Sequence, residues 1–214
     1  ALVEYSTDGI SWTTTPPTAV EGANTIQVRQ TDVAGNVSAP ATLTFTLDTA
    51  VAAPVIALTT DTGANTSDGI TRDGSYSVTG TEPGAVVEYS TDGATWSTTA
   101  PVAVEGANTI QVRQTDVAGN VSAPATLTFT LDTAVAAPVI ALTTDTGANT
   151  SDGITRDGSY TVTGTEPGAL VEYSTDGISW TTTPPTAVEG ANTIQVRQTD
   201  VAGNVSAPAT LTFT

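Results

Sequence analysis

The chain has 214 residues and a formal net charge of −17, from 22 acidic residues against five arginines, with no lysine, histidine or cysteine. Such an acidic surface repels phosphates, which argues against nucleic acids and anionic membrane surfaces as partners. The missing cysteines and histidines exclude disulfides, thiol chemistry and the usual zinc sites, and no apolar run reaches the ~20 residues of a membrane helix.

The sequence repeats itself with a period of 84 residues. The same segment opens at Ala1, Ala85 and Ala169, and residues 1–46 are identical to residues 169–214. We therefore predict three domains: a partial repeat at 1–47 and complete repeats at 48–131 and 132–214. The partial repeat lacks the first strands of the others, so an open sheet edge and a half-built core are expected there. It is either a window cut from a longer array or completed by another chain.

The first half of the middle repeat predicts two strands. Residues 54–60 are β-branched and apolar, with the proline placed where a strand can begin. Residues 61–74 form a loop dense in Asp, Asn and Gly. Residues 76–81 alternate apolar and polar side chains, which indicates a strand with one buried face, and the Glu-Pro-Gly sequence at 82–84 then turns the chain.

The second half of the repeat predicts the remaining strands. Residues 87–90 lead through an Asp-Gly turn at 92–93 into a return strand that carries Trp96 as a core anchor. Within residues 108–115, Ile110 and Val112 are predicted to point inward and Gln111 and Arg113 outward. Residues 125–131 give the clearest alternation, with threonines between Ala, Leu, Phe and Leu.

Short strands separated by turns, with no segment of helical period, predict an all-β antiparallel β-sandwich of about seven strands per repeat. An up-and-down barrel is the alternative. In a sandwich the loops gather at two ends. The loop at 61–74 is expected at the far end of its repeat, and the turns at 82–84 and 116–120 at the near end, beside the junction at 47–58.

Several motifs occur in a fixed order. They read TDVAGNVS at 115–122, TFTLDT at 128–133, GTEPGA at 80–85 and YSTDGATW at 89–96. In this order they resemble the bacterial immunoglobulin-like repeats of giant surface adhesins. The resemblance implies tandem immunoglobulin-like domains in an extended rod, secreted by a type I route to the bacterial cell surface. It also implies a role as a spacer that supports adhesion and biofilm formation.

The acidic loops predict calcium at the junctions. Asp61 and Asp68 at the far end of one repeat are expected to approach Asp132 and Asp200 of the next. Two carboxylates about 4 Å apart repel by roughly 4 kcal/mol at an effective dielectric near 20, and calcium, which takes six to eight oxygen ligands, relieves this repulsion. In the resembled family, calcium at such junctions stiffens the rod. The alternative is that these residues serve only as turn formers and solubilising charge.

The candidate ligands follow from the repeat. Glu82 and Glu166 are candidate additional ligands. The principal candidates are Asp48, Asp61, Asp68, Asp116, Asp132, Asp145, Asp152 and Asp200.

An enzyme is not expected, because histidine, cysteine and lysine are missing and near-identical repeats offer no distinctive cleft. Two non-enzymatic functions remain. The first is a spacer whose partners are neighbouring repeats of the same chain. The second is a repeated module that binds a glycan, another surface ligand or further copies in a filament.

Overall fold

The computed structural model describes residues 1–214, which is the whole chain. All its regular elements are β-strands, so the all-β prediction is confirmed. No helix of the length and hydrophobicity needed to cross a membrane is present. The chain divides into two compact units. The first contains residues 1–54, 80–87 and 113–124, and the second contains residues 55–79, 88–112 and 125–214.

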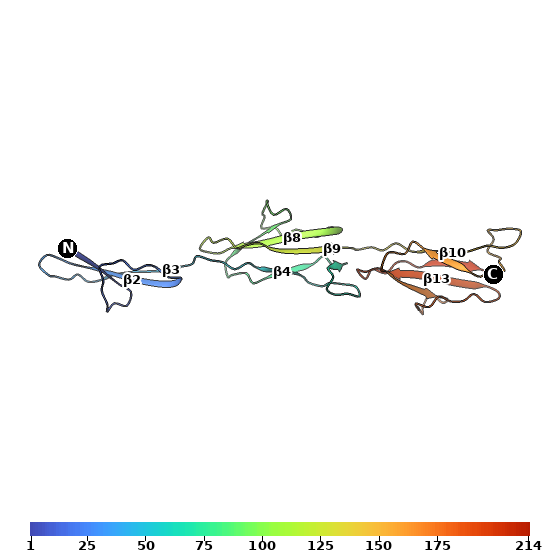
Figure 1. Cartoon of the computed structure of the whole chain (residues 1–214), viewed down its shortest axis with the longest axis horizontal. Helices are drawn as coiled ribbons and strands as arrows, with labels where there is room; N and C mark the ends of the chain where they lie inside the picture. The colour runs from blue at the N-terminus through green and yellow to red at the C-terminus, as the bar shows by residue number, and fades with distance from the viewer. The chain divides into compact units, whose positions relative to one another are not determined.

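The first unit contains a three-stranded antiparallel sheet, drawn in blue in Figure 1. Its strands are β1 (Leu2–Ser6), β2 (Gly22–Thr31) and β3 (Ala41–Leu47). The long strand β2 lies in the centre and pairs with both neighbours. Its period-two alternation of apolar and polar residues places Ile26 and Val28 on one face and Thr25 on the other.

The middle repeat contains a two-stranded and a four-stranded sheet. The sheet orders are β4-β6 and β5-β9-β8-β7. The strands are β4 (Val55–Leu58), β5 (Ile70–Thr71), β6 (Tyr76–Thr79), β7 (Val86–Ser90), β8 (Gly106–Thr115) and β9 (Ala125–Leu131). β4 pairs antiparallel with β6 and β8 pairs antiparallel with β9, whereas β5 pairs in parallel with β9.

The third repeat, within the second unit, packs two antiparallel sheets of orders β10-β11 and β12-β13-β14. Its strands are β10 (Val139–Leu142), β11 (Tyr160–Thr163), β12 (Leu170–Ser174), β13 (Asn192–Thr199) and β14 (Ala209–Phe213). The core between the sheets consists of Ile140, Ile194, Val196 and Phe213, with Leu142, Tyr160 and Val162 packed against it. These are the inward positions of alternating strands, so the sandwich interpretation is confirmed and the barrel is not formed.

The predicted return strand that follows the Asp-Gly turn is shorter than expected. In the middle repeat it is reduced to one bridge between Tyr89 and Ser97, closed by N–H···O bonds of 2.7 and 3.0 Å. Pro101 follows shortly afterwards, and a proline lacks the N–H needed to continue a ladder. The complete repeats have six regular strands in the middle repeat and five in the third, compared with the prediction of about seven.

Candidate functional site

Three carboxylates meet at one end of each complete repeat. In the third repeat they belong to Asp132, Glu166 and Asp200, each with one oxygen within 4.8 Å of the others. Asp132 follows β9 directly, Glu166 lies in the turn between β11 and β12, and Asp200 follows β13. The group therefore joins the junction segment to two loops. We call it the third-repeat carboxylate group.

The same group occurs in the first unit. It consists of Asp48, Glu82 and Asp116, again within 4.8 Å of one another. Asp48 directly follows β3, as Asp132 follows β9. The structure thus brings together the near-end loops and the junction aspartates, as the sequence predicts, and places Glu82 in the group as well.

A buried turn positions Asp200. The aspartate is 6% exposed and Asn204 is 8% exposed. The Asn204 backbone N–H donates to Asp200 Oδ1 at 2.8 Å, and its side-chain Nδ2 donates to Asp200 Oδ2 at 2.7 Å. The same Nδ2 donates to the backbone oxygen of Asp132 at 2.8 Å. Asn204 therefore ties the junction segment to the turn, independently of any ion.

The equivalent contacts hold the group in the first unit. Asn120 Nδ2 donates to Asp116 Oδ2 at 2.8 Å and to the backbone oxygen of Asp48 at 3.0 Å. The side-chain hydrogen bond from Asn120 is the main cause that keeps the pKa of Asp116 below its usual value. Asp116 is therefore a carboxylate anion at neutral pH, as a metal ligand must be.

A buried glutamine positions the glutamate. Gln198 is fully buried, and its Oε1 accepts a hydrogen bond of 2.8 Å from the Glu166 backbone N–H. Its Nε2 donates to the backbone oxygens of Ala136 at 2.8 Å and Gly164 at 3.2 Å. One side chain therefore fastens the junction segment and the Glu166 turn to β13. Gln114 makes the same three contacts in the middle repeat.

These glutamines and asparagines position the carboxylate groups, a role that sequence reasoning missed. A signal was present, because Gln114 follows Ile110 and Val112 at a spacing of two and so points inward with them. A polar side chain at an inward position must find hydrogen-bond partners. The sequence could not show that those partners come from the junction segment and the turn at 80–82.

The arrangement fits a hard cation. Each group offers only carboxylate oxygens, and backbone carbonyls lie close by. Oxygens within 4.8 Å of one another can share one calcium, whose ligands lie at 2.3–2.6 Å. Three anionic side chains this close also repel one another unless a cation is shared.

The four loop aspartates predicted as ligands do not belong to these groups. Asp61 Oδ2 accepts from the Gly69 N–H at 2.9 Å and Asp68 Oδ1 from the Ile70 N–H at 3.0 Å, both within their own loop. Asp145 and Asp152 make the same bonds in the third repeat. Asp61 Oδ1 and Asp145 Oδ1 are buried without a hydrogen-bond partner. A role of these aspartates in a metal site stays a prediction.

The loop that carries Asp61 also contacts the turn at 200–204, within the second unit. Thr62 Oγ1 donates to the Ala202 carbonyl at 2.7 Å, and Arg72 Nη1 donates to the Gly203 carbonyl at 2.7 Å. Gly63 has a φ of +98°, and a Cβ there would lie 2.1 Å from the Val201 carbonyl oxygen. Only glycine fits this position.

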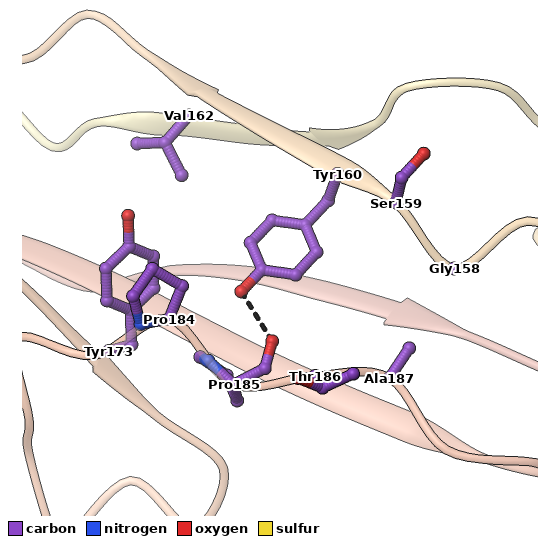
Figure 2. A pocket seen from close by; sticks show the side chains of 9 residues that line it. All are labelled: Gly158, Ser159, Tyr160, Val162, Tyr173, Pro184, Pro185, Thr186 and Ala187. Carbon is purple, nitrogen blue, oxygen red and sulfur yellow. Dashed lines mark hydrogen bonds between the residues drawn. The ribbon is translucent and has the colours of Figure 1, made fainter.

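A second feature is an open groove of about 690 Å³ in the third repeat. Figure 2 shows Tyr160 reaching from β11 toward the backbone of Pro185, to which its hydroxyl donates at 2.8 Å. Tyr173, Val162 and Pro184 also line it. Burial raises the pKa of Tyr160, so its hydroxyl is neutral at physiological pH. The lining combines these aromatic and aliphatic side chains with the hydroxyl groups of Ser159 and Thr186.

The comparison with protein families agrees with this architecture. A family model described as bacterial Ig-like domain matches residues 3–49 and 50–133. Among curated proteins there is no match. A solved structure, of Clostridium thermocellum CbhA fibronectin(III)-like modules, is similar at 17% identity over 74% of this chain and 93% of that chain, with a TM-score of 0.37.

Proposed function

The chain belongs to the bacterial Ig-like domain family, and from this premise we propose that it is a structural spacer of a bacterial surface adhesin, with calcium-stiffened junctions between repeats. The spacer holds the adhesive part of the protein away from the cell and so supports adhesion and biofilm formation. Near-identical copies favour this role, because length is then the property that the repeats set. An extracellular location suits it, since the calcium concentration there can fill weak sites.

The observation that carries the proposal is the recurrence of the three-carboxylate group at both junction aspartates. Asp132, Glu166 and Asp200 would hold one calcium ion, and Asp48, Glu82 and Asp116 a second. Calcium supplies positive charge that offsets the repulsion among the carboxylates. Because Asp132 directly follows β9 while the other two residues belong to loops of the third repeat, the shared ion would restrain the junction segment.

Calorimetric titration of the full chain with calcium chloride tests the binding. We expect two sites, with dissociation constants in the range of about 10⁻⁴ to 10⁻³ M that extracellular calcium modules show. Asp200→Asn should remove one of them. Asp32→Asn is the matched control, because Asp32 occupies the same place in an identical sequence but belongs to neither group. No binding heat, or equal losses in the two variants, would contradict the proposal.

Small-angle scattering of the full chain, with calcium and after chelation, tests the stiffening. The maximum dimension and the flexibility of the chain should change on chelation, and Asp48→Asn with Asp132→Asn should reproduce the chelated profile in calcium. Unchanged profiles would leave calcium binding without a mechanical role. Protease treatment of intact bacteria tests the location, since a surface spacer should be cleaved without lysis.

The second candidate function is a repeated binding module. The groove at Tyr160 and Tyr173 supports it, because a groove with corresponding tyrosines, Tyr76 and Tyr89, occurs in the middle repeat. Aromatic faces are suited to stacking against sugar rings or proline-rich peptides. Binding of the full chain to a glycan array, with loss in Tyr173→Ala, would favour this function over the spacer.

A further inference from the structure

A loop of the middle repeat meets a turn of the third repeat, and both belong to the second unit. The loop spans residues 61–74 and the turn residues 200–204. Two side-chain donors of the loop bond to adjacent backbone carbonyls of the turn, each at 2.7 Å: Thr62 Oγ1 to Ala202 and Arg72 Nη1 to Gly203. The same turn carries Asp200 of the third-repeat carboxylate group. We call the two hydrogen bonds the loop–turn contact.

Glycines on both sides let the two backbones approach each other. A Cβ at Gly63 would lie 2.1 Å from the Val201 carbonyl oxygen, and a Cβ at Gly203 would lie 3.1 Å from the Gly63 Cα. Gly147, the counterpart of Gly63 in the third repeat, also has a positive φ, but its Cβ would meet nothing closer than 3.9 Å. A side chain at position 63 would therefore push the loop and the turn apart.

Hydrogen bonds within the loop direct the Thr62 hydroxyl toward the turn. Its oxygen accepts from the Arg72 backbone N–H at 2.8 Å, and its proton is left for the carbonyl of the turn. The fully buried Thr71 hydroxyl lies 3.1 Å away. The corresponding loop of the third repeat has the same internal bond, from the Arg156 N–H to Thr146 Oγ1 at 2.8 Å. The loop's own structure thus sets the position of this donor.

The turn connects the contact to the Asp200 carboxylate, because its own hydrogen bonds close it. The Asp200 N–H donates to the Asn204 carbonyl at 3.0 Å, and the Gly203 N–H donates to the Asp200 carbonyl at 3.2 Å. Asn204 also donates to both carboxylate oxygens of Asp200. A turn closed in this way shifts as one body. The place of the Asp200 carboxylate therefore depends on where the loop holds the turn.

We propose that Thr62 and Arg72 are positioning residues for the third-repeat carboxylate group, through which one repeat sets the calcium affinity of the next. This inference rests on the proposed function, which takes calcium as the ion of the group. The loop keeps Asp200 beside Asp132 and Glu166 against the repulsion among the three carboxylates. Groups that orient a metal ligand typically change metal affinity by about 10–100-fold. By linkage, calcium strengthens the loop–turn contact by the same factor.

Calorimetric titration with calcium chloride tests this in two backgrounds that each keep one carboxylate group intact. Asp116→Asn keeps the third-repeat group, and Asp200→Asn keeps the group of the first unit. Arg72→Ala should weaken calcium binding about tenfold in the Asp116→Asn background and leave it unchanged in the Asp200→Asn background.

The sign of the change separates positioning from charge. Loss of the positive charge of Arg72 alone would raise the affinity of nearby carboxylates for a cation. An unchanged or higher affinity in the Asp116→Asn background, or an equal loss in both backgrounds, would overturn the inference and leave the proposed function standing. Absence of calcium binding by the unmodified chain would overturn the proposed function, and this inference with it.

Gly63→Ala separates the loop from the turn without removing a donor or a charge. In the Asp116→Asn background it should weaken calcium binding, whereas Gly147→Ala, with the same left-handed backbone and no clash, should not. Hydrogen exchange in chelator gives a readout that needs no calcium. The amides of Gly203 and Asn204 should exchange faster in Gly63→Ala than in Gly147→Ala. Equal exchange, or equal calcium affinities, in these two variants would overturn the inference that the loop holds the turn.

Discussion

The buried glutamine of the third repeat offers a stability test with an internal control. Replacing Gln198 by Ala removes three hydrogen bonds, of 2.8, 2.8 and 3.2 Å. It also leaves the backbone groups of Ala136, Gly164 and Glu166 without this partner. Each such bond contributes about 0.5–1.5 kcal/mol net, so we expect the third repeat to lose about 1.5–4.5 kcal/mol.

This loss is large for a repeat of its size. Small domains have about 0.05–0.15 kcal/mol of stability per residue, which gives about 4–12 kcal/mol for a repeat of this period. A change of 1 kcal/mol moves the melting temperature of such a domain by about 4–8 °C. In Gln198→Ala the third repeat should therefore melt at least about 6 °C lower, ahead of the rest of the chain.

The assay uses tryptophan fluorescence, since each repeat has one tryptophan. With Trp12 and Trp96 replaced by Phe, Trp180 alone reports on the third repeat, where the Arg197 guanidinium lies 4.2 Å from its ring centre. Urea and thermal unfolding of this chain are compared with and without Gln198→Ala.

Gln30→Ala, with Trp12 as the only reporter, is the matched control, because the local sequence is the same but the side chain is exposed. It should change stability by less than about 0.5 kcal/mol. A loss below about 1 kcal/mol in Gln198→Ala, or an equal loss in the control, would refute the reasoning that these three bonds hold the junction segment in place.

Two further predictions concern single positions. Gly63→Val should lower the stability of the second unit by more than Gly147→Val, as measured by thermal unfolding. Both glycines have positive φ, but only at Gly63 would a Cβ clash, 2.1 Å from the Val201 carbonyl oxygen; equal effects would contradict this. The N–H of Ile178 is the main donor that lowers the pKa of Asp176. The ionised Asp176 side chain therefore stabilises the folded state. This contribution is fully present above the pKa of an unfolded aspartate, near 4, and is lost as the pH falls through the lower pKa of the folded state. The free energy of unfolding, measured in chelator from pH 7 to pH 2, should therefore fall with pH, and it should fall less in Asp176→Asn. The same pH dependence in both chains would contradict this role of Asp176.

Much of the fold could be predicted from the alternation of apolar and polar side chains along the sequence. The strand predicted over residues 125–131 matches β9 at both ends, and the strand predicted at 54–60 contains β4. The short strand β5 was missed inside the predicted loop at 61–74. Its two residues, Ile70 and Thr71, pair in parallel with β9, and a pair this short leaves no periodic signal.

The candidate site could be predicted only in part. The sequence indicated that the junction aspartates and the near-end turns share one end of the repeat, and Asp132 and Asp200 do lie together. It could not indicate that Asp61 bonds to Gly69 in its own loop, since an aspartate in a turn can bind locally or point outward. Glu166 was a secondary candidate, yet its carboxylate lies within the group, because Gln198 fixes the turn that carries it.

The most direct test of the central claim is the melting of the full chain in calcium and in chelator. A site filled at about 100 times its dissociation constant adds about 2.7 kcal/mol. The complete repeats should therefore melt about 10 °C higher in calcium, and Asp116→Asn with Asp200→Asn should abolish the difference. Identical melting curves of the unmodified chain in calcium and in chelator would contradict calcium-stabilised junctions.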